Sequence, residues 1–148
     1  MSNQEIAQAM RGHHAIMAQQ LQDLAQKLET AESAWQSARE AVAAYLTNEV
    51  LPHAAAEEST VYRVGTNLAN LTKLIESMLY EHTVIQSLTE RLQGSPTQSQ
   101  ALTLAAQAAK LFEVHAEKEN RFIIAVLEPR EDVDLEAVLG DMHQLLAY

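Results

Sequence analysis

The sequence has no cysteine and few of the residues that interrupt helices. Without cysteine the chain can form no disulfide, thiolate metal site or catalytic thiol, so any metal must be bound by nitrogen and oxygen atoms. Only four glycines and three prolines occur, whereas alanine, leucine, glutamine and glutamate are abundant and favour helices over strands. The composition therefore predicts an all-α protein, and 148 residues suffice for one domain with a single core.

Positive charge is also scarce. The chain has 10 lysines and arginines against 20 aspartates and glutamates, a formal net charge of −10, and its basic residues form no cluster. Nucleic-acid backbones and anionic membrane surfaces are bound by concentrated positive charge, so we expect neither as a partner. No stretch approaches the roughly 18 apolar residues of a membrane span, and the first residues do not resemble a secretion signal. We therefore expect a cytoplasmic protein.

Apolar residues recur at spacings of three and four along most of the chain, which is the pattern of helices with one buried face. The four helices that this pattern predicts lie at about residues 6–30, 34–65, 67–93 and 98–127. Helices of similar length with short connections favour an up-down-up-down four-helix bundle over residues 1–128. Residues 129–148 carry enough apolar side chains for a short C-terminal helix, packed on the bundle or on a partner.

Several residues predict local features of these helices. Pro52 removes a backbone donor inside the second helix, so we expect a kink or a briefly unwound turn just before it. Gly65 is expected to end that helix, and Asn67 to cap the third one. Phe122 and Val126 belong to the apolar stripe of the fourth helix, so we expect them in the core.

Two pairs of residues with the spacing His-x3-Glu stand on alternate predicted helices. His53 and Glu57 lie on the second helix, and His115 and Glu119 lie on the fourth. Residues four apart share one face of a helix, so the two side chains of each pair can bind the same ion. The sequence thus predicts two imidazole and carboxylate pairs that point into one core.

The first and third helices each add one histidine to the predicted interior. His14 lies between two methionines of the first apolar stripe, and His82 lies between Met78 and Ile85 of the third. In an alternating bundle, the distances of these histidines from the helix ends place all four at one level. The six residues of this predicted metal site are His14, His53, Glu57, His82, His115 and Glu119.

Burial of both glutamates requires positive charge that the predicted core does not contain. An unpaired buried carboxylate is costly, and no lysine or arginine lies on the inward stripes near this level. A pair of metal cations would supply the charge; imidazole with carboxylate suits iron, manganese or zinc, and two carboxylates able to bridge favour two irons. The alternative is that no metal binds. Each histidine would then be an ordinary hydrogen-bonded core residue, and each His-x3-Glu pair would be a contact exposed to solvent. That alternative requires all six residues to have reached these positions by coincidence.

The segments that carry these residues resemble one known family. They are His13-His14, His53-Ala54-Ala55-Ala56-Glu57-Glu58, Glu81-His82 and His115-Ala116-Glu117-Lys118-Glu119. Over about residues 5–128 the chain is similar to the hemerythrin-like, or HHE cation-binding, domain. The resemblance implies a non-haem di-iron centre in a four-helix bundle, with Glu57 and Glu119 as bridging carboxylates and the four histidines as terminal ligands.

The sequence departs from the oxygen carriers of this family in one respect. Those proteins take an additional histidine from a His-x3-His pair on the third helix, whereas Met78 and Gln86 stand four residues from His82 here. The departure implies a more open or more oxygen-rich site and argues against simple reversible oxygen carriage. Water, Glu81 or Tyr62 could complete the coordination, although core packing is the more ordinary role for Tyr62.

Other polar residues near the site are expected outside the ligand set. His13 is expected at the edge of the core and His143 on the surface outside the bundle. Glu58 and Glu117 are expected to face solvent, although Glu58 could orient a neighbouring ligand. Three methionines near the predicted site could line an apolar channel for a small gas.

Three functions fit such a site. The favoured one is binding of a small ligand (oxygen, nitric oxide or peroxide) for sensing, storage or delivery. The alternatives are a di-iron enzyme acting on peroxide or nitric oxide, and a structural or interaction bundle that the metal holds together. An oxidase of organic substrates is not favoured, because nothing in the sequence identifies an organic-substrate pocket. Manganese or zinc could replace iron, and the physiological ligand, redox partner and oligomeric state stay open.

Overall fold

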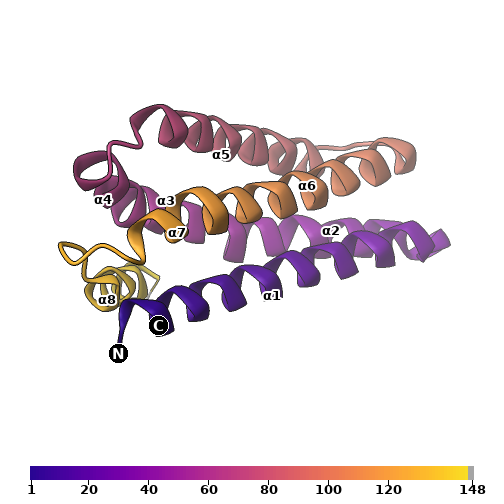
Figure 1. Ribbon diagram of the computed structural model, residues 1–148. Coiled ribbons are helices and arrows are strands. Elements are labelled where there is room, and N and C mark those ends of the chain that lie inside the picture. The colour runs from indigo at the N-terminus through magenta and orange to yellow at the C-terminus, as the bar shows by residue number, and fades with distance from the viewer. Residues whose placement is uncertain (147–148) are drawn as a thin grey trace.

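Helices make up every regular element of residues 1–146, the part of the chain that the computed structural model describes. Figure 1 shows four long rods side by side: α1, then α2 with α3, then α5, then α6 with α7. A short helix, α8, packs on α1 and α3 at the end that holds the N-terminus. The predicted all-α bundle with a short C-terminal helix is confirmed. The bounds are Asn3–Thr30 (α1), Trp35–Tyr45 (α2), Leu51–Ser59 (α3), Val61–Leu68 (α4), Thr72–Gln93 (α5), Gln98–Glu119 (α6), Ala125–Leu127 (α7) and Leu135–Leu145 (α8).

Two of the rods begin with a capping box, in which a hydroxyl and a longer polar side chain satisfy backbone amides reciprocally. At α1 the Ser2 hydroxyl accepts from the amide of Glu5, whose carboxylate accepts from the amide of Ser2. Thr97 and Gln100 form the same arrangement at α6. These caps fix where the helices that carry His14 and His115 start.

The second rod is distorted just before Pro52, as the sequence predicts. A π-helical turn, Leu46–Val50, ends with the amide of Leu51 donating to the carbonyl five residues earlier. A proline has no amide hydrogen, so a regular helix would leave one carbonyl in this turn without its partner. The wider turn lies directly before α3, which carries one of the histidine and glutamate pairs.

The end of the second rod differs from the prediction. The rod breaks at Thr60, where φ is −126° and ψ is −88°, and α4 continues past Gly65 to Leu68. Gly65 is buried against α5, and a β-carbon there would come within 2.9 Å of Cδ1 of Ile75. The expectation that Gly65 ends a helix is therefore wrong, because this glycine permits close packing of α4 on α5.

The start of the third rod also differs from the prediction. α5 begins at Thr72 after an N-terminal residue, Leu71, that makes no side-chain capping bond, so Asn67 is not the cap. Asn70 instead adopts a left-handed backbone conformation with φ of 54°. Asparagine tolerates that conformation better than most residues, and the chain turns there rather than at Asn67.

The buried face of the fourth rod is shifted near its end. Phe122 and Val126, predicted as core residues, are 50% and 38% exposed. Asn120–Ile124 form a second π-helical turn, which holds more residues per turn than an α-helix and so moves the inward face along the sequence. The side chains buried instead are those of Ile123, Ile124 and Leu127.

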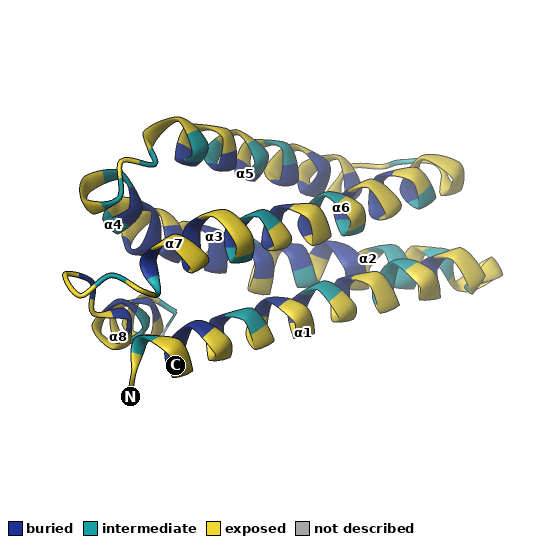
Figure 2. Ribbon diagram, viewed as in Figure 1, coloured by how far each residue is buried: buried dark blue, intermediate teal, exposed yellow. Residues whose placement is uncertain are grey.

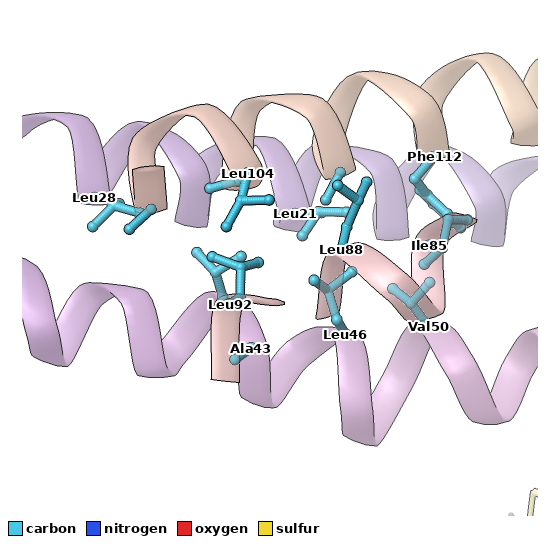
Figure 3. Close-up of a cluster of buried hydrophobic side chains, with 14 of the residues drawn as sticks. Leu21, Leu28, Ala43, Leu46, Val50, Ile85, Leu88, Leu92, Leu104 and Phe112 are labelled. Carbon is cyan, nitrogen blue, oxygen red and sulfur yellow. The ribbon is translucent and has the colours of Figure 1, made fainter. Parts of the chain in front are cut away.

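Buried apolar side chains form two clusters along the bundle. The cluster drawn in Figure 3 joins residues of α1, α2, α5 and α6, such as Leu21 and Leu92. The other cluster includes residues of α8, such as Leu135. On α1, His14 lies between Met10 of the second cluster and Met17 of the first. Figure 2 shows the buried residues on the inward faces of the rods. The buried histidines and glutamates form a polar level between the two apolar clusters.

The described helices were compared with the length and hydropathy that a membrane span needs. Among residues 1–146, no helix is both long enough and apolar enough to cross a membrane. The expectations of a cytoplasmic location and of no nucleic-acid partner stay predictions.

Candidate metal centre

All six residues of the predicted site are buried and come together at one level of the bundle. None of them is more than 6% exposed. They come from all four rods: His14 from α1, His53 and Glu57 from α3, His82 from α5, and His115 and Glu119 from α6. The convergence that the helical spacing predicts is present, while ligation of a metal by these residues stays a prediction.

Five of the six side chains form two groups that share one glutamate, and Glu119 lies beside the second group. In the first group, one donor atom each from His14, His53 and Glu57 lie within 4.8 Å of one another. In the second group, the same holds for Glu57, His82 and His115. We call these groups the His14/His53 half and the His82/His115 half of the centre. Glu57 belongs to both halves, and an oxygen of Glu119 lies 2.8 Å from Nε2 of His115.

Three of the four histidines are held from outside by an oxygen acceptor. Because each of these rings donates its Nδ1 hydrogen outward, its Nε2 atom faces the centre with a free lone pair when the ring is neutral. The outer contacts are Nδ1 of His14 to Oδ1 of Asn120 at 2.8 Å, Nδ1 of His82 to Glu58 at 2.8 Å, and Nδ1 of His115 to Glu81 at 2.9 Å.

The inward nitrogens lie close to one another. Nε2 of His82 is 2.9 Å from Nε2 of His115, and Nε2 of His53 is 3.3 Å from Nε2 of His14. Two lone pairs at such distances repel, and either a proton or a metal ion bound to the nitrogens relieves the repulsion. The arrangement of four imidazoles therefore fits a site for cations.

The two carboxylates at the centre lack enough positive charge to ionise together. Burial raises the pKa of Glu119, and the neighbouring charge of Glu57 raises it further, to about 7. Burial also acts to raise the pKa of Glu57, but the charge of His53 and the hydrogen bond with Glu119 hold it well below its usual range. One of these carboxyl groups thus keeps its proton up to about neutral pH, and cations at the centre would allow both to ionise.

The pKa of His14 also reflects the negative charge of the two buried carboxylates. Burial alone would lower the pKa of His14, but the hydrogen bond with Glu57 and the charge of Glu119 raise it to about 9. The protein without metal therefore holds a proton on this imidazole to balance the carboxylates. A metal ion in this place would supply the same charge.

His53 differs from the other three histidines, because it has no outer acceptor. Its Nδ1 atom is buried and has no hydrogen-bond partner in the described structure. The ring of His13 lies beside it, with the two ring centroids 5.3 Å apart. His13 is exposed at the edge of the core, as the sequence predicts.

Tyr62 reaches the centre, although the sequence favours ordinary core packing for it. Its hydroxyl lies 3.2 Å from Nε2 of His82 and 3.2 Å from Nε2 of His115, and its ring stacks on His82. The break at Thr60 separates α3 from α4 and re-aims the side chains that follow it. Burial, with the negative charge of Glu57, raises the pKa of Tyr62, so the hydroxyl keeps its hydrogen in the chain alone.

The charged residues around the centre act on the histidines from outside. Glu58, although its side chain is 43% exposed, accepts from His82, which is the contact that an orienting role would need, while that role stays a prediction. Glu81 accepts from His115 through one oxygen and from Nζ of Lys118 through the other, at 2.9 Å each. Both oxygens of Glu81 are thereby engaged away from the inward nitrogens. Glu117 is exposed, as predicted.

Asn120 is a contact that sequence reasoning missed. It follows Glu119 directly, and in a regular helix adjacent residues point about 100° apart, so spacing alone gave no reason to place it near the centre. Here the π-helical turn begins at Asn120, and its side chain meets His14 on the neighbouring rod.

A cavity of about 210 Å³ reaches one half of the centre. Its lining includes His14, His53, Glu57 and Glu119, but neither His82 nor His115. The exposed side chain of His143 on α8 also lines it. The cavity therefore gives an outside molecule access to the His14/His53 half.

The fold and the donor set define a helical bundle with buried histidine and glutamate clusters suited to a cation. The family model for the hemerythrin HHE cation-binding domain matches residues 5–127. The chain belongs to that family. Searches of the curated proteins and of the solved structures found no significant match. α8 lies beyond the matched residues.

Proposed function

We propose that the protein holds two iron ions at this centre and binds a small ligand (oxygen, nitric oxide or peroxide) there for sensing, storage or delivery. The observation that carries the proposal is the set of four inward-facing imidazole nitrogens around two buried carboxylates. No lysine or arginine contacts these carboxylates in the described structure, and the two donor groups meet at Glu57. Two cations would satisfy all six donors at once.

Each half of the centre would hold one ion. His14 and His53 would bind the first ion and His82 and His115 the second, with Glu57 and Glu119 as the carboxylates available to both. Manganese or zinc could bind the same nitrogen and oxygen donors in place of iron. Iron is proposed because two carboxylates able to bridge, with imidazoles shared between two metals, are typical of di-iron proteins.

Tyr62 is the residue proposed to complete the His82/His115 half. Its hydroxyl lies 3.2 Å from both inward nitrogens of that half, so it could serve as a further oxygen donor there. A metal ion favours the ionised form of an oxygen donor, which would offset the raised pKa of this phenol. Glu81 is not proposed as a ligand, because both of its oxygens are engaged outside the centre.

The chain's own residues would hold the donors in place and keep bulk water away. The acceptors Asn120, Glu58 and Glu81 fix three ring orientations, and such outer contacts commonly increase metal affinity. Apolar residues of the second cluster, such as Met10 and Val61, line the cavity beside the centre. When bound, two irons would supply the sites at which a small ligand binds and the electrons that it exchanges.

A di-iron enzyme acting on peroxide or nitric oxide is the second candidate. The cavity beside the His14/His53 half favours it over a bundle in which metal serves only stability, because a purely structural site needs no access. Turnover of peroxide or nitric oxide far above that of free iron would decide in favour of the enzyme.

The test is metal content together with the ultraviolet and visible absorption of the purified protein. The protein would be reduced without air and then exposed separately to oxygen, peroxide and nitric oxide. We expect two irons per chain and absorption bands that change with at least one of these molecules. A folded protein that takes up no added iron would overturn the proposal, and iron with no response to any ligand would leave only the structural role.

A further inference from the structure

The cavity beside the centre is larger than the proposed small ligands require. It measures about 210 Å³ and its floor is formed by His14, His53, Glu57 and Glu119. One water occupies a share of about 30 Å³ in the liquid, and an apolar cavity of about 150 Å³ can hold benzene. Oxygen or nitric oxide would therefore fill only a small part of this space.

Most of the cavity wall is apolar. Met10 of α1, Val61 of α4, Ile124 of the second π-helical turn, and Leu139 and Met142 of α8 contribute to it. None of the described lining residues is a lysine or an arginine. A largely apolar molecule would therefore bury its surface against these walls.

One wall is the C-terminal helix, and specific contacts hold it in place. Asn3 of α1 donates through Nδ2 to the carbonyl of Val133 at 2.8 Å and accepts through Oδ1 from the amide of Leu135 at 3.0 Å. Arg11 of α1 pairs with Glu128 at 2.7 Å, just after α7. These contacts hold both ends of the segment between α7 and α8 against α1. The position of the wall is therefore fixed by contacts within the fold.

The polar groups of the cavity are confined to its floor and to two histidines, His13 and His143. His13 is exposed at the edge of the core, and its ring lies beside that of His53. A molecule in the cavity would therefore meet apolar side chains along its length and the metal donors at one end.

We propose that this cavity binds a largely apolar organic molecule of about the size of one substituted ring, with its polar end toward the floor. The inference rests on the proposed function, since the metal centre forms that floor, and it adds an organic molecule to the ligands of the same site. It also changes the interpretation of the sequence, in which no organic-substrate pocket could be identified. α8, which forms part of the wall, lies beyond the residues matched by the family model.

The probe for the test is 4-fluorobenzyl alcohol, followed by fluorine NMR in the presence of the metal-loaded protein. We expect saturable binding to both iron-loaded and zinc-loaded protein, with much stronger broadening of the fluorine line by iron because the probe lies beside the metals. The matched probe 2,2,2-trifluoroethanol carries a hydroxyl but no ring, and it is expected to bind less tightly because it buries less apolar surface. Equally tight binding of trifluoroethanol would overturn the assignment of a ring-sized apolar ligand.

Two exposed alanines of α1 provide a matched pair of variants. Ala9 lines the cavity, whereas Ala15 does not, so Ala9→Trp would fill the entrance while Ala15→Trp would add the same ring elsewhere on the helix. We expect Ala9→Trp to weaken probe binding by about tenfold or more, the usual scale for overfilling a site, and Ala15→Trp to leave it unchanged. Equal binding by the two variants would place the probe outside the cavity and overturn the proposal.

A second pair of variants tests the wall formed by α8. Leu139 lines the cavity and Leu145 is exposed away from it, so Leu139→Phe should weaken binding and Leu145→Phe should not. The two proposals fail in different ways. Iron loading without probe binding would overturn only the organic ligand, and a chain that takes up no iron would overturn the proposed di-iron function whether or not the probe binds.

Discussion

The two halves of the centre have the same pair of nitrogen donors but different surroundings. At the His82/His115 half, the Tyr62 hydroxyl lies 3.2 Å from both inward nitrogens, and both rings are held by carboxylates. At the His14/His53 half, one ring is held by an amide, the other has an unpartnered Nδ1, and the cavity reaches both. The comparison indicates one half that anchors its ion and one half that can exchange ligands.

The largest expected effect comes from the residue that both halves share. Replacing Glu57 with alanine removes a donor from each group, and we expect the variant to lose both ions rather than one. Metal content per chain measures this, with Glu113→Ala, an exposed carboxylate on α6, as the control that keeps both ions. Retention of two ions by a folded Glu57→Ala variant would show that the halves do not share this glutamate.

The next effect distinguishes the outer contacts of the halves. Removal of such contacts typically costs roughly 10–100-fold in metal affinity. We expect Glu81→Ala to weaken iron binding more than Asn120→Ala, because a carboxylate makes the imidazole that it holds more basic than an amide does. Competition with a chelator measures the affinities, and Glu76→Ala on the exposed face of α5 is the control. A larger loss of iron affinity in Asn120→Ala than in Glu81→Ala would contradict the distinction between an anchored and an exchangeable half.

A smaller change tests the phenol of the anchored half. Tyr62→Phe keeps the ring that stacks on His82 but removes the hydroxyl, so we expect both ions to be retained while an absorption band arising from a phenolate bound to iron disappears. Tyr80→Phe, an exposed tyrosine on α5, should leave the spectrum unchanged. An identical spectrum for Tyr62→Phe would mean that water or another donor completes this half.

The smallest expected effect is a pH dependence of the metal-free protein. The pKa of His14 is raised from its ordinary 6.5 to about 9 by Glu57 and Glu119, against the effect of burial. The stabilisation from that proton is therefore complete below pH 6.5 and is lost as the pH rises through about 9.

We expect the free energy of unfolding of the metal-free protein to contain this falling contribution between these pH values, and the His14→Gln variant to lack it. Metal binding should show the opposite trend, because protons compete for the same donors. Urea unfolding across this pH range, with and without metal, measures both. A slope that is identical in the wild-type and His14→Gln proteins would contradict the assignment.

Much of the bundle could be predicted because it depends on local spacing. The helical period placed His14 and His82 on inward stripes, and the His-x3-Glu spacing placed each glutamate on the face of its histidine. The distortion just before Pro52 and the loop before Gln98 also follow from the chemistry of single residues. The convergence of the six side chains could therefore be predicted from the amino-acid sequence alone.

The remaining features depend on irregular turns and on contacts between distant residues. The π-helical turn after Glu119 moved Phe122 to the surface and brought Asn120 to His14, and the break at Thr60 brought Tyr62 to the centre. A fixed helical period cannot anticipate such changes of register. The cavity depends on the docking of α8, which Asn3 holds from more than a hundred residues away in the sequence.

The most direct test of two unequal halves is anomalous X-ray diffraction at the iron edge, from crystals of the iron-loaded protein. We predict two iron peaks: one beside His14 and His53, the other beside His82, His115 and Tyr62, with Glu57 reaching both. Soaking with the organic probe should add density only at the first. A single iron peak, or probe density next to His82 and His115, would contradict the assignment of an anchored and an exchangeable half.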